Sequence, residues 1–189
     1  RFPGKPLAMI CNKPMIQHVY ERVLSVKQIY DVYVATDDKR IFDCVETFGG
    51  KAIMTSQCNC GTDRVYQASK DIDCDIVLNI QGDEPTIKTE MIEDLISAFN
   101  DDKVQFATLK KRCEISDDYF APNTVKVITD INGDAIYFSR YAVPYNRDDR
   151  LINYYKHIGV YGYTKKFLKK YVSLPQSSLE LAESLEQLR

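Results

Sequence analysis

The chain has 189 residues, of which 44% are hydrophobic and 28% charged, and 25 basic against 27 acidic residues leave a formal net charge of −2. A chain of this length and composition can bury one sizeable core without disulfides or a structural metal. The balanced charge excludes the broad cationic surface that nucleic-acid binding requires, so any anion-binding site must be local.

Targeting signals and metal-ligand spacings are absent from the sequence. No apolar run is long enough to span a membrane, and no signal segment opens the chain. Six cysteines without a C-x-x-C pair, accompanied by two histidines, favour free thiols over disulfides or a zinc site. We therefore expect a cytoplasmic protein with no membrane partner. The chain opens on "RFPGKPL" and closes inside a helical pattern, so we expect a single domain over 1–189, incomplete at both ends.

Helical and strand-like segments alternate over the first 110 residues. Apolar periodicity predicts helices at 14–27, 39–50, 62–72 and 89–100. Runs rich in apolar and β-branched residues predict strands at 31–37, 51–54, 75–81 and 105–110. Thr62 or Asp63 is expected to cap the third helix. This alternation is typical of an open α/β sheet with mostly parallel strands and helices on both faces.

The second half of the chain changes character. Three runs rich in Val, Ile and Tyr, at 124–130, 134–140 and 157–164, predict antiparallel strands added to the parallel core. The Asn-Gly in "INGD" suits a tight hairpin turn between the first two. The closing segment 177–188 predicts an amphipathic helix with Ser177 or Ser178 as its cap.

Two acidic segments follow predicted strands, "ATDD" at 35–38 and "QGDEP" at 81–85. Ligands of open α/β sheets bind at the carboxyl ends of the strands, so we expect both segments to face one crevice. Mg²⁺ prefers oxygen ligands and is commonly shared between a carboxylate and a substrate phosphate, a role that suits Asp83. Gly82 is expected to let the backbone approach a ligand closely. The alternative is a strand that simply ends in solvent.

Two further segments suit phosphate or nucleotide binding. "RFPGKPL" places Arg1 and Lys5 around a Pro-Gly turn, which can direct two cations toward phosphate oxygens, although a basic surface turn is the alternative. "GTDR" places Gly61 and Thr62 at a helix N-terminus with Arg64 nearby, where a nucleotide or an ordinary cap would fit.

Taken together and in order, these segments resemble the cytidylyltransferases that activate 3-deoxy-D-manno-octulosonate (KDO), the CMP-KDO synthetases. The resemblance extends over essentially the whole chain and is carried by "RFPGKPL", "ATDD", "GTDR", "NIQGDEP", "PNTVKVI", "AIYFSR", "VPY", "HIGVYGY" and "LEQLR". It implies a Rossmann-like, GT-A-like nucleotidyltransferase fold with three α/β/α layers. It also implies a homodimer, with 124–164 as the antiparallel sugar-binding and dimerisation part.

The resemblance implies a role for each matching residue. Asp83 would bind Mg²⁺, with a partner carboxylate beyond Arg189, and Lys5 would act with it in catalysis. The nucleotide CTP would be held by Arg1, Gly4, Lys5, Thr62, Arg64 and Gln81. The acidic sugar KDO would be surrounded by Arg140, His157, Tyr161, Glu186 and Gln187. For these sugar-site residues, and for Tyr163, the alternative is ordinary packing or a solvated strand or helix.

The activity implied is transfer of CMP from CTP to KDO, for lipopolysaccharide or another surface polysaccharide. An enzyme of the same fold acting on sialic acid, 8-amino-KDO or a hexose 1-phosphate is one alternative. A nucleotide-binding relative without catalysis is the alternative from another class.

Overall fold

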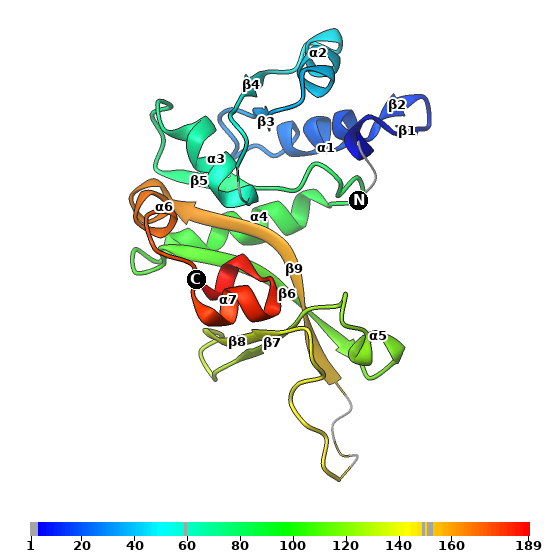
Figure 1. Ribbon diagram of the computed structural model, residues 1–189, viewed down its shortest axis with the longest axis vertical. Helices are drawn as coiled ribbons and strands as arrows, with labels where there is room; N and C mark the ends of the chain where they lie inside the picture. The colour runs from blue at the N-terminus through cyan, green and yellow to red at the C-terminus, as the bar shows by residue number, and fades with distance from the viewer. Residues whose placement is uncertain (1–3, 59, 149, 151–152) are drawn as a thin grey trace. The chain divides into compact units, whose positions relative to one another are not determined.

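The structure is a computed structural model that describes residues 4–58, 60–148, 150 and 153–189 (Figure 1). Arg1 therefore lies outside the described residues. The chain divides into two compact units: Arg1–Ala107 with Val160–Val172, and Thr108–Gly159 with Ser173–Arg189. The single domain expected over 1–189 stays a prediction, and each unit is described by itself.

The first unit contains the alternating elements of the N-terminal half. Its helices are α1 (Met15–Leu24), α2 (Lys39–Thr47), α3 (Gly61–Ser69), α4 (Thr89–Ser97) and α6 (Lys165–Val172). Its strands are β1 (Met9–Ile10), β2 (Lys13–Pro14), β3 (Val34–Thr36), β4 (Ala52–Met54) and β5 (Ile76–Asn79), with short 3-10 turns η1 (Lys5–Leu7) and η2 (Ala98–Asn100). The helices and strands predicted for this half are confirmed, with bounds that differ by a few residues.

Strand pairing in the first unit is less parallel than expected. β3 pairs in parallel with β4, with Ala35 opposite Ile53. β5 instead pairs antiparallel with the end of β9 (Asn153–Thr164), with Val77 opposite Tyr163. The α/β class is confirmed, but the expected mostly parallel sheet is corrected to one parallel pair among the described residues. The strand beside β5 is β9, which comes from the second half of the chain and runs in the opposite direction.

An aromatic core holds β5, β9 and α6 together. Val77, Tyr161, Tyr163 and Leu168 form its buried centre. The ring of Phe106 stacks on Tyr163 at a centroid distance of 4.8 Å, with an interplanar angle of 5°. Each such side chain contributes about 1.5–3 kcal/mol by leaving water. The packing interpretation of Tyr163 is therefore confirmed.

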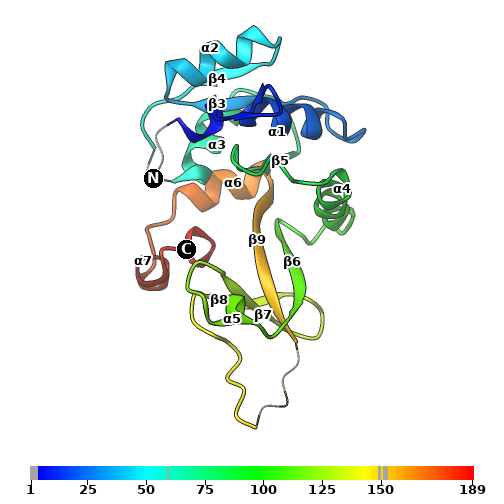
Figure 2. The same ribbon diagram turned by 90° about the vertical axis from the view of Figure 1, so that its right-hand side faces the viewer.

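The second unit is built on antiparallel strands (Figure 2). It contains β7 (Lys126–Thr129), β8 (Ala135–Ser139), most of β6 (Phe106–Glu114), the start of β9, α5 (Asp117–Phe120), α7 (Ser178–Glu183) and the 3-10 turn η3 (Glu186–Leu188). β7 and β8 pair antiparallel, with Val127 opposite Phe138. The turn between them places Gly133 at φ +94°, a conformation that glycine adopts without strain, so the predicted Asn-Gly hairpin is confirmed.

The predicted terminal helix 177–188 is wrong beyond its first half. Ser177 caps α7 as expected, since its hydroxyl accepts a hydrogen bond from the Glu180 amide at 3.0 Å. The helix ends at Glu183 because Ser184 adopts the left-handed conformation, with φ 51° and ψ 49°. This turn lets Leu185, which is 6% exposed, pack against Val127 and Phe138. Burial of Leu185 thus outweighs continuation of the helix.

The helices and the cysteines also bear on membrane spans and on disulfides. Among the described residues, none of the helices has the length and apolar character needed to cross a membrane. All six cysteines are described, and none of them is in a disulfide.

Candidate functional site

The loop after β5 presents Asp83 at the surface of the first unit. β5 ends at Asn79, and the chain then turns, with the Glu84 amide donating to the Gln81 carbonyl at 3.2 Å. A Cβ on Gly82 would lie 2.9 Å from the Cδ1 atom of Ile16 on α1. The absence of a side chain at Gly82 therefore leaves room for Ile16 of α1. This packing fixes the backbone from which Asp83 projects. The expectation that Gly82 lets the backbone approach a ligand stays a prediction.

Lys5 and Asp83 form the centre of the candidate site. The Lys5 Nζ donates to the Asp83 Oδ2 at 2.7 Å, although 78 positions separate the two residues. Both side chains are accessible, with 49% and 41% of their surfaces exposed. The hydrogen bond that Lys5 donates to Asp83 raises the pKa of Lys5 above its ordinary value. The expected catalytic pair is thus brought together where a ligand can reach it.

The Asp83 carboxylate also suits a divalent cation. The ammonium group of Lys5 rests on its oxygen, which shows that a cation is accommodated there. Across the described ranges, no three His, Cys, Asp or Glu side chains gather as a complete ligand set. Mg²⁺ commonly binds one or two carboxylates together with waters and substrate phosphates. The site therefore fits a metal that is shared with a phosphate-bearing substrate.

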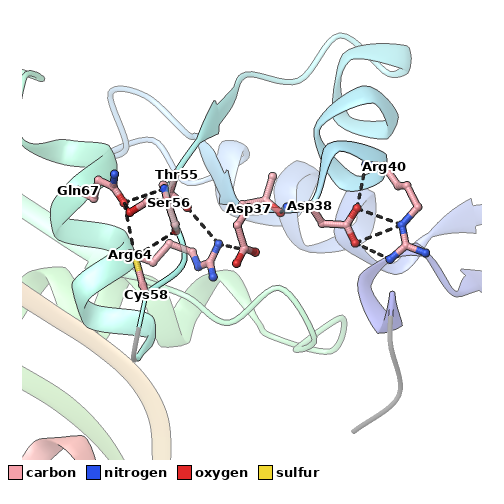
Figure 3. Close-up of polar contacts among 9 residues, drawn as sticks. Asp37, Asp38, Arg40, Thr55, Ser56, Cys58, Arg64 and Gln67 are labelled. Carbon is pink, nitrogen blue, oxygen red and sulfur yellow. Dashed lines mark hydrogen bonds and ion pairs between the residues drawn. The ribbon is translucent and has the colours of Figure 1, made fainter.

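Arg64 of α3 contacts the first acidic segment (Figure 3). Its Nη1 lies 2.8 Å from the Asp37 Oδ1 and donates to the Thr55 hydroxyl at 3.0 Å. The hydrogen bond from Arg64 lowers the pKa of Asp37. Asp37 thus pairs with Arg64, whereas Asp83 pairs with Lys5. The expectation that the two acidic segments face one crevice stays a prediction.

Arg40 is a cation near the basic loop that sequence reasoning missed. Asp38 caps α2 by accepting from the Arg40 amide at 2.9 Å, and the Arg40 guanidinium donates to the same carboxylate (Figure 3). This side-chain hydrogen bond lowers the pKa of Asp38 to about 2. The Arg40 Nη2 lies 3.9 Å from the position that a Cβ on Gly4 would occupy. No sequence signal marks Arg40, since a basic residue in the first turn of a helix is ordinary.

The start of α3 differs from the prediction. Cys60 is the N-cap residue, and no side chain among the described residues caps the helix, so the expected cap by Thr62 or Asp63 is wrong. Thr62 is fully buried, and its hydroxyl lies 3.2 Å from the Tyr163 hydroxyl. The contact with the aromatic core takes this side chain away from a capping position. A role for Thr62 in nucleotide binding would therefore act through its backbone.

Gln81 lies beside α3 together with Asn79, a residue that sequence reasoning missed. A Cβ on Gly61 would lie 3.4 Å from the Gln81 Nε2 and 3.7 Å from the Asn79 Nδ2. Asn79 is 4% exposed, and its Nδ2 has no hydrogen-bond partner among the residues that the structure describes. Such an unpaired buried amide costs about 1–3 kcal/mol. In the sequence, Asn79 stands out as the one polar residue in the apolar run "VLNI", and this pattern could have marked it as a site residue.

The residues expected to bind the sugar are divided between the units. Tyr161 belongs to the first unit, where it is 6% exposed and stacks near Phe106. Arg140, His157, Glu186 and Gln187 belong to the second unit. The guanidinium of Arg140 donates to the carbonyl oxygens of Pro122, Glu183 and Ser184. Arg140 thus lies against the chain that leads into η3, which carries Glu186 and Gln187.

His157 is held in a buried environment. It is 8% exposed, its Nε2 lies 2.9 Å from the Thr108 hydroxyl, and its ring meets that of Phe138 edge-on at 4.9 Å. Burial lowers the pKa of His157 to about 4, so the imidazole is neutral at pH 7. A neutral imidazole can donate or accept one hydrogen bond at each nitrogen.

The buried imidazole predicts an acid-sensitive fold. The unfolded chain protonates His157 near pH 6.5, whereas the folded chain protonates it only near pH 4. The stability that depends on the neutral imidazole is therefore complete above pH 6.5 and is lost as the pH falls from there toward pH 4. Between pH 7.5 and pH 5 the wild type should lose about 2 kcal/mol more unfolding free energy than His157→Gln. Urea unfolding of both proteins at the two pH values measures this. Parallel losses, or an imidazole that titrates near pH 6.5 by NMR, would contradict it.

Comparison with known proteins defines the class. Residues 1–189 match the cytidylyltransferase family along their whole length, and the chain belongs to this family. The 3-deoxy-manno-octulosonate cytidylyltransferase of Thermodesulfovibrio yellowstonii is 52% identical over 204 residues, covering 100% of this chain and 80% of the relative. The 8-amino-3,8-dideoxy-manno-octulosonate cytidylyltransferase of Shewanella pealeana is 48% identical over 195 residues, with 100% and 80% covered.

A solved structure shows the same fold. The CMP:2-keto-3-deoxy-manno-octonic acid synthetase complexed with CTP superimposes with a TM-score of 0.94 at 46% identity, covering 100% of this chain and 78% of that protein. The expected nucleotidyltransferase fold and the resemblance to the CMP-KDO synthetases are therefore confirmed.

Proposed function

We propose that the chain transfers CMP from CTP to the anomeric hydroxyl of 3-deoxy-D-manno-octulosonate, with release of pyrophosphate. The observation that carries the proposal is the contact between Lys5 and Asp83, at 2.7 Å and in reach of a ligand. The similarity to enzymes named for this sugar supports the choice of substrates.

The chemistry requires positioning and charge neutralisation. The anomeric 2-hydroxyl of the sugar attacks the α-phosphorus of CTP, and negative charge grows on the pyrophosphate that leaves. Lys5 would neutralise part of that charge. Asp83 would hold Mg²⁺, which would supply Lewis acidity to the transfer. No covalent intermediate on the protein is required.

The nucleotide would lie over the residues gathered in the first unit. Gly4 has a φ of +72°, which turns the basic loop tightly ahead of Lys5. Arg64 and Gln81, from α3 and the loop after β5, would place the nucleoside, and Thr62 would contribute its backbone amide. Arg1, which lies outside the described residues, is still proposed to bind phosphate.

The acidic sugar would be recognised by five residues with different chemistry. Arg140 would meet the carboxylate, because a guanidinium forms two parallel hydrogen bonds with such a group. The hydroxyls would be bound by His157, Tyr161, Glu186 and Gln187. We also propose, from the family resemblance, that the enzyme is a cytoplasmic homodimer.

A second candidate substrate is the 8-amino analogue of the same sugar. The observation that favours it is the 48% identity to an enzyme named for 8-amino-3,8-dideoxy-manno-octulosonate, close to the 52% for the enzyme named for the parent sugar. Both substrates keep the carboxylate and the anomeric hydroxyl, so the proposed mechanism is the same for each.

The test is Mg²⁺-dependent pyrophosphate release by the full-length protein. CTP, UTP, ATP and GTP are each combined with KDO, 8-amino-KDO, sialic acid and glucose 1-phosphate. We expect release with CTP and KDO. Release only with the 8-amino sugar would favour the second candidate. CTP binding without release with any sugar would contradict both and favour a non-catalytic nucleotide-binding protein.

A further inference from the structure

Glu183, the last residue of α7, is surrounded by hydrogen-bond donors from the end of β8. Its Oε1 accepts from the Ser139 hydroxyl at 2.6 Å and from the Tyr137 hydroxyl at 3.1 Å. Its Oε2 accepts from the backbone amide of Arg140 at 2.8 Å. One carboxylate therefore binds three groups of β8 and the residue after it, although more than 40 positions separate them in the sequence.

The contact between Glu183 and Arg140 is reciprocal. The Arg140 Nε donates to the Glu183 carbonyl at 2.7 Å, and its Nη2 donates to the Ser184 carbonyl at 3.3 Å. The ammonium of Lys126, which is 0% exposed, donates to the Arg140 carbonyl at 2.6 Å. Both the backbone and the guanidinium of Arg140 are therefore held by this cluster.

The hydrogen bonds also stabilise the charged form of the Glu183 carboxylate. Burial opposes ionisation, but hydrogen bonds from Ser139, the Arg140 amide and Tyr137 outweigh it and lower the pKa of Glu183 below its ordinary value. Hydrogen bonds to an ionised carboxylate are shorter and stronger than those between neutral groups. The charge thus strengthens the link between β8 and α7.

Hydrogen bonds and an ion pair join the start of α7 to the segment that follows Glu183. Ser177 donates its hydroxyl to the Leu188 carbonyl at 2.6 Å. Arg189 binds the Glu180 carboxylate through two nitrogens, at 2.7 and 3.0 Å, with only 4% and 5% of the two side chains exposed. α7 and η3 therefore form one tight element, and Glu183 is where that element meets β8.

We propose that Glu183 is a positioning residue for the acidic-sugar site, fixing the guanidinium of Arg140 against the segment that carries Glu186 and Gln187. This inference rests on the proposed function. Glu183 is proposed to act through Arg140 and not on the sugar itself, because its carboxylate is engaged by Tyr137, Ser139 and the Arg140 amide. Arg140 has five N–H groups, of which three are used by carbonyl oxygens, so it keeps donors for a substrate carboxylate.

The test is Glu183→Gln in the full-length protein, with Glu93→Gln on the exposed surface of α4 as the matched control. Glutamine has the same shape but brings an N–H₂ group against the donors that Glu183 binds. We expect KM for KDO to rise about tenfold, the usual scale for disturbing a hydrogen bond to a charged group, while KM for CTP changes less than about twofold. Glu93→Gln should change neither value.

A milder variant protects the test against misfolding. Tyr137→Phe removes one of the three hydrogen bonds to Glu183 and is expected to raise KM for KDO about threefold. An unchanged KM for KDO in Glu183→Gln would overturn the proposal. Equal rises in KM for KDO and for CTP would also overturn it, because they would indicate a general structural role.

Hydrogen exchange separates this proposal from the proposed function. Without substrate, the amides of 139–141 and 184–188 should exchange faster in Glu183→Gln, while those of α4 keep their wild-type rates. If the wild type released no pyrophosphate from CTP and KDO, the proposed function would fail, and the exchange rates would still decide on the positioning role. Unchanged exchange at 139–141 would overturn it.

Discussion

Replacing Asp83 by asparagine is expected to lower kcat by at least about 1,000-fold while leaving the fold intact. The side chain is 41% exposed, so its loss of charge disturbs little of the packing around it. Asparagine keeps the size of the residue but removes the charge that would hold Mg²⁺ and that pairs with Lys5. Because the metal would act on the developing charge, the loss should appear in kcat as well as in KM.

The adjacent acid supplies the control for this experiment. Glu84→Gln removes one negative charge from the same exposed loop, and we expect it to retain most of the activity. Pyrophosphate release gives the rates, and circular dichroism with thermal unfolding checks the fold. Activity of Asp83→Asn within about tenfold of the wild type would remove the basis for assigning the metal to this residue.

Replacing Lys5 by methionine is expected to lower kcat/KM for CTP by about 100- to 1,000-fold. Methionine keeps much of the side-chain length but has no charge to offset the pyrophosphate that leaves. The melting temperature should change little, because ion pairs between exposed side chains contribute little to stability. Lys88→Met, at an exposed position beyond the Asp83 loop, is the matched control and should keep wild-type kinetics.

The same variant has a readout that does not depend on turnover. In the structure the Lys5 ammonium rests on the carboxylate oxygen that a metal would use. Lys5→Met should therefore bind Mn²⁺, used as a spectroscopic substitute for Mg²⁺, more tightly than the wild type when CTP is absent. Equal or weaker Mn²⁺ binding would show that Lys5 and the metal do not compete for Asp83.

Lys5 and Asp83 were identifiable from the sequence, because each belongs to a short segment whose composition suits a ligand site. Lys5 lies in a Pro-Gly turn, and Asp83 follows an apolar strand. The distance between their charged atoms was not predictable, because it depends on how the loop after β5 packs against α1 through Gly82 and Ile16.

Some residues carried no local signal at all. Arg40 looks like any basic residue at a helix start, and its position near Gly4 follows from the packing of η1 against α2. Glu183 looks like a solvated helical residue, yet it accepts three hydrogen bonds from the end of β8. Such contacts join segments far apart in the chain, so no periodicity or spacing marks them.

The sequence by itself determined the α/β class, the order of most helices and strands, the Asn-Gly hairpin and a serine cap for the last helix at Ser177 or Ser178. These depend on interactions between neighbouring residues, which leave a pattern in the chain. Only the tertiary structure decided that β5 pairs antiparallel with β9, that Thr62 turns into the aromatic core, and that the last helix stops at Glu183. In each case burial of side chains from distant segments outweighed the local preference of the chain.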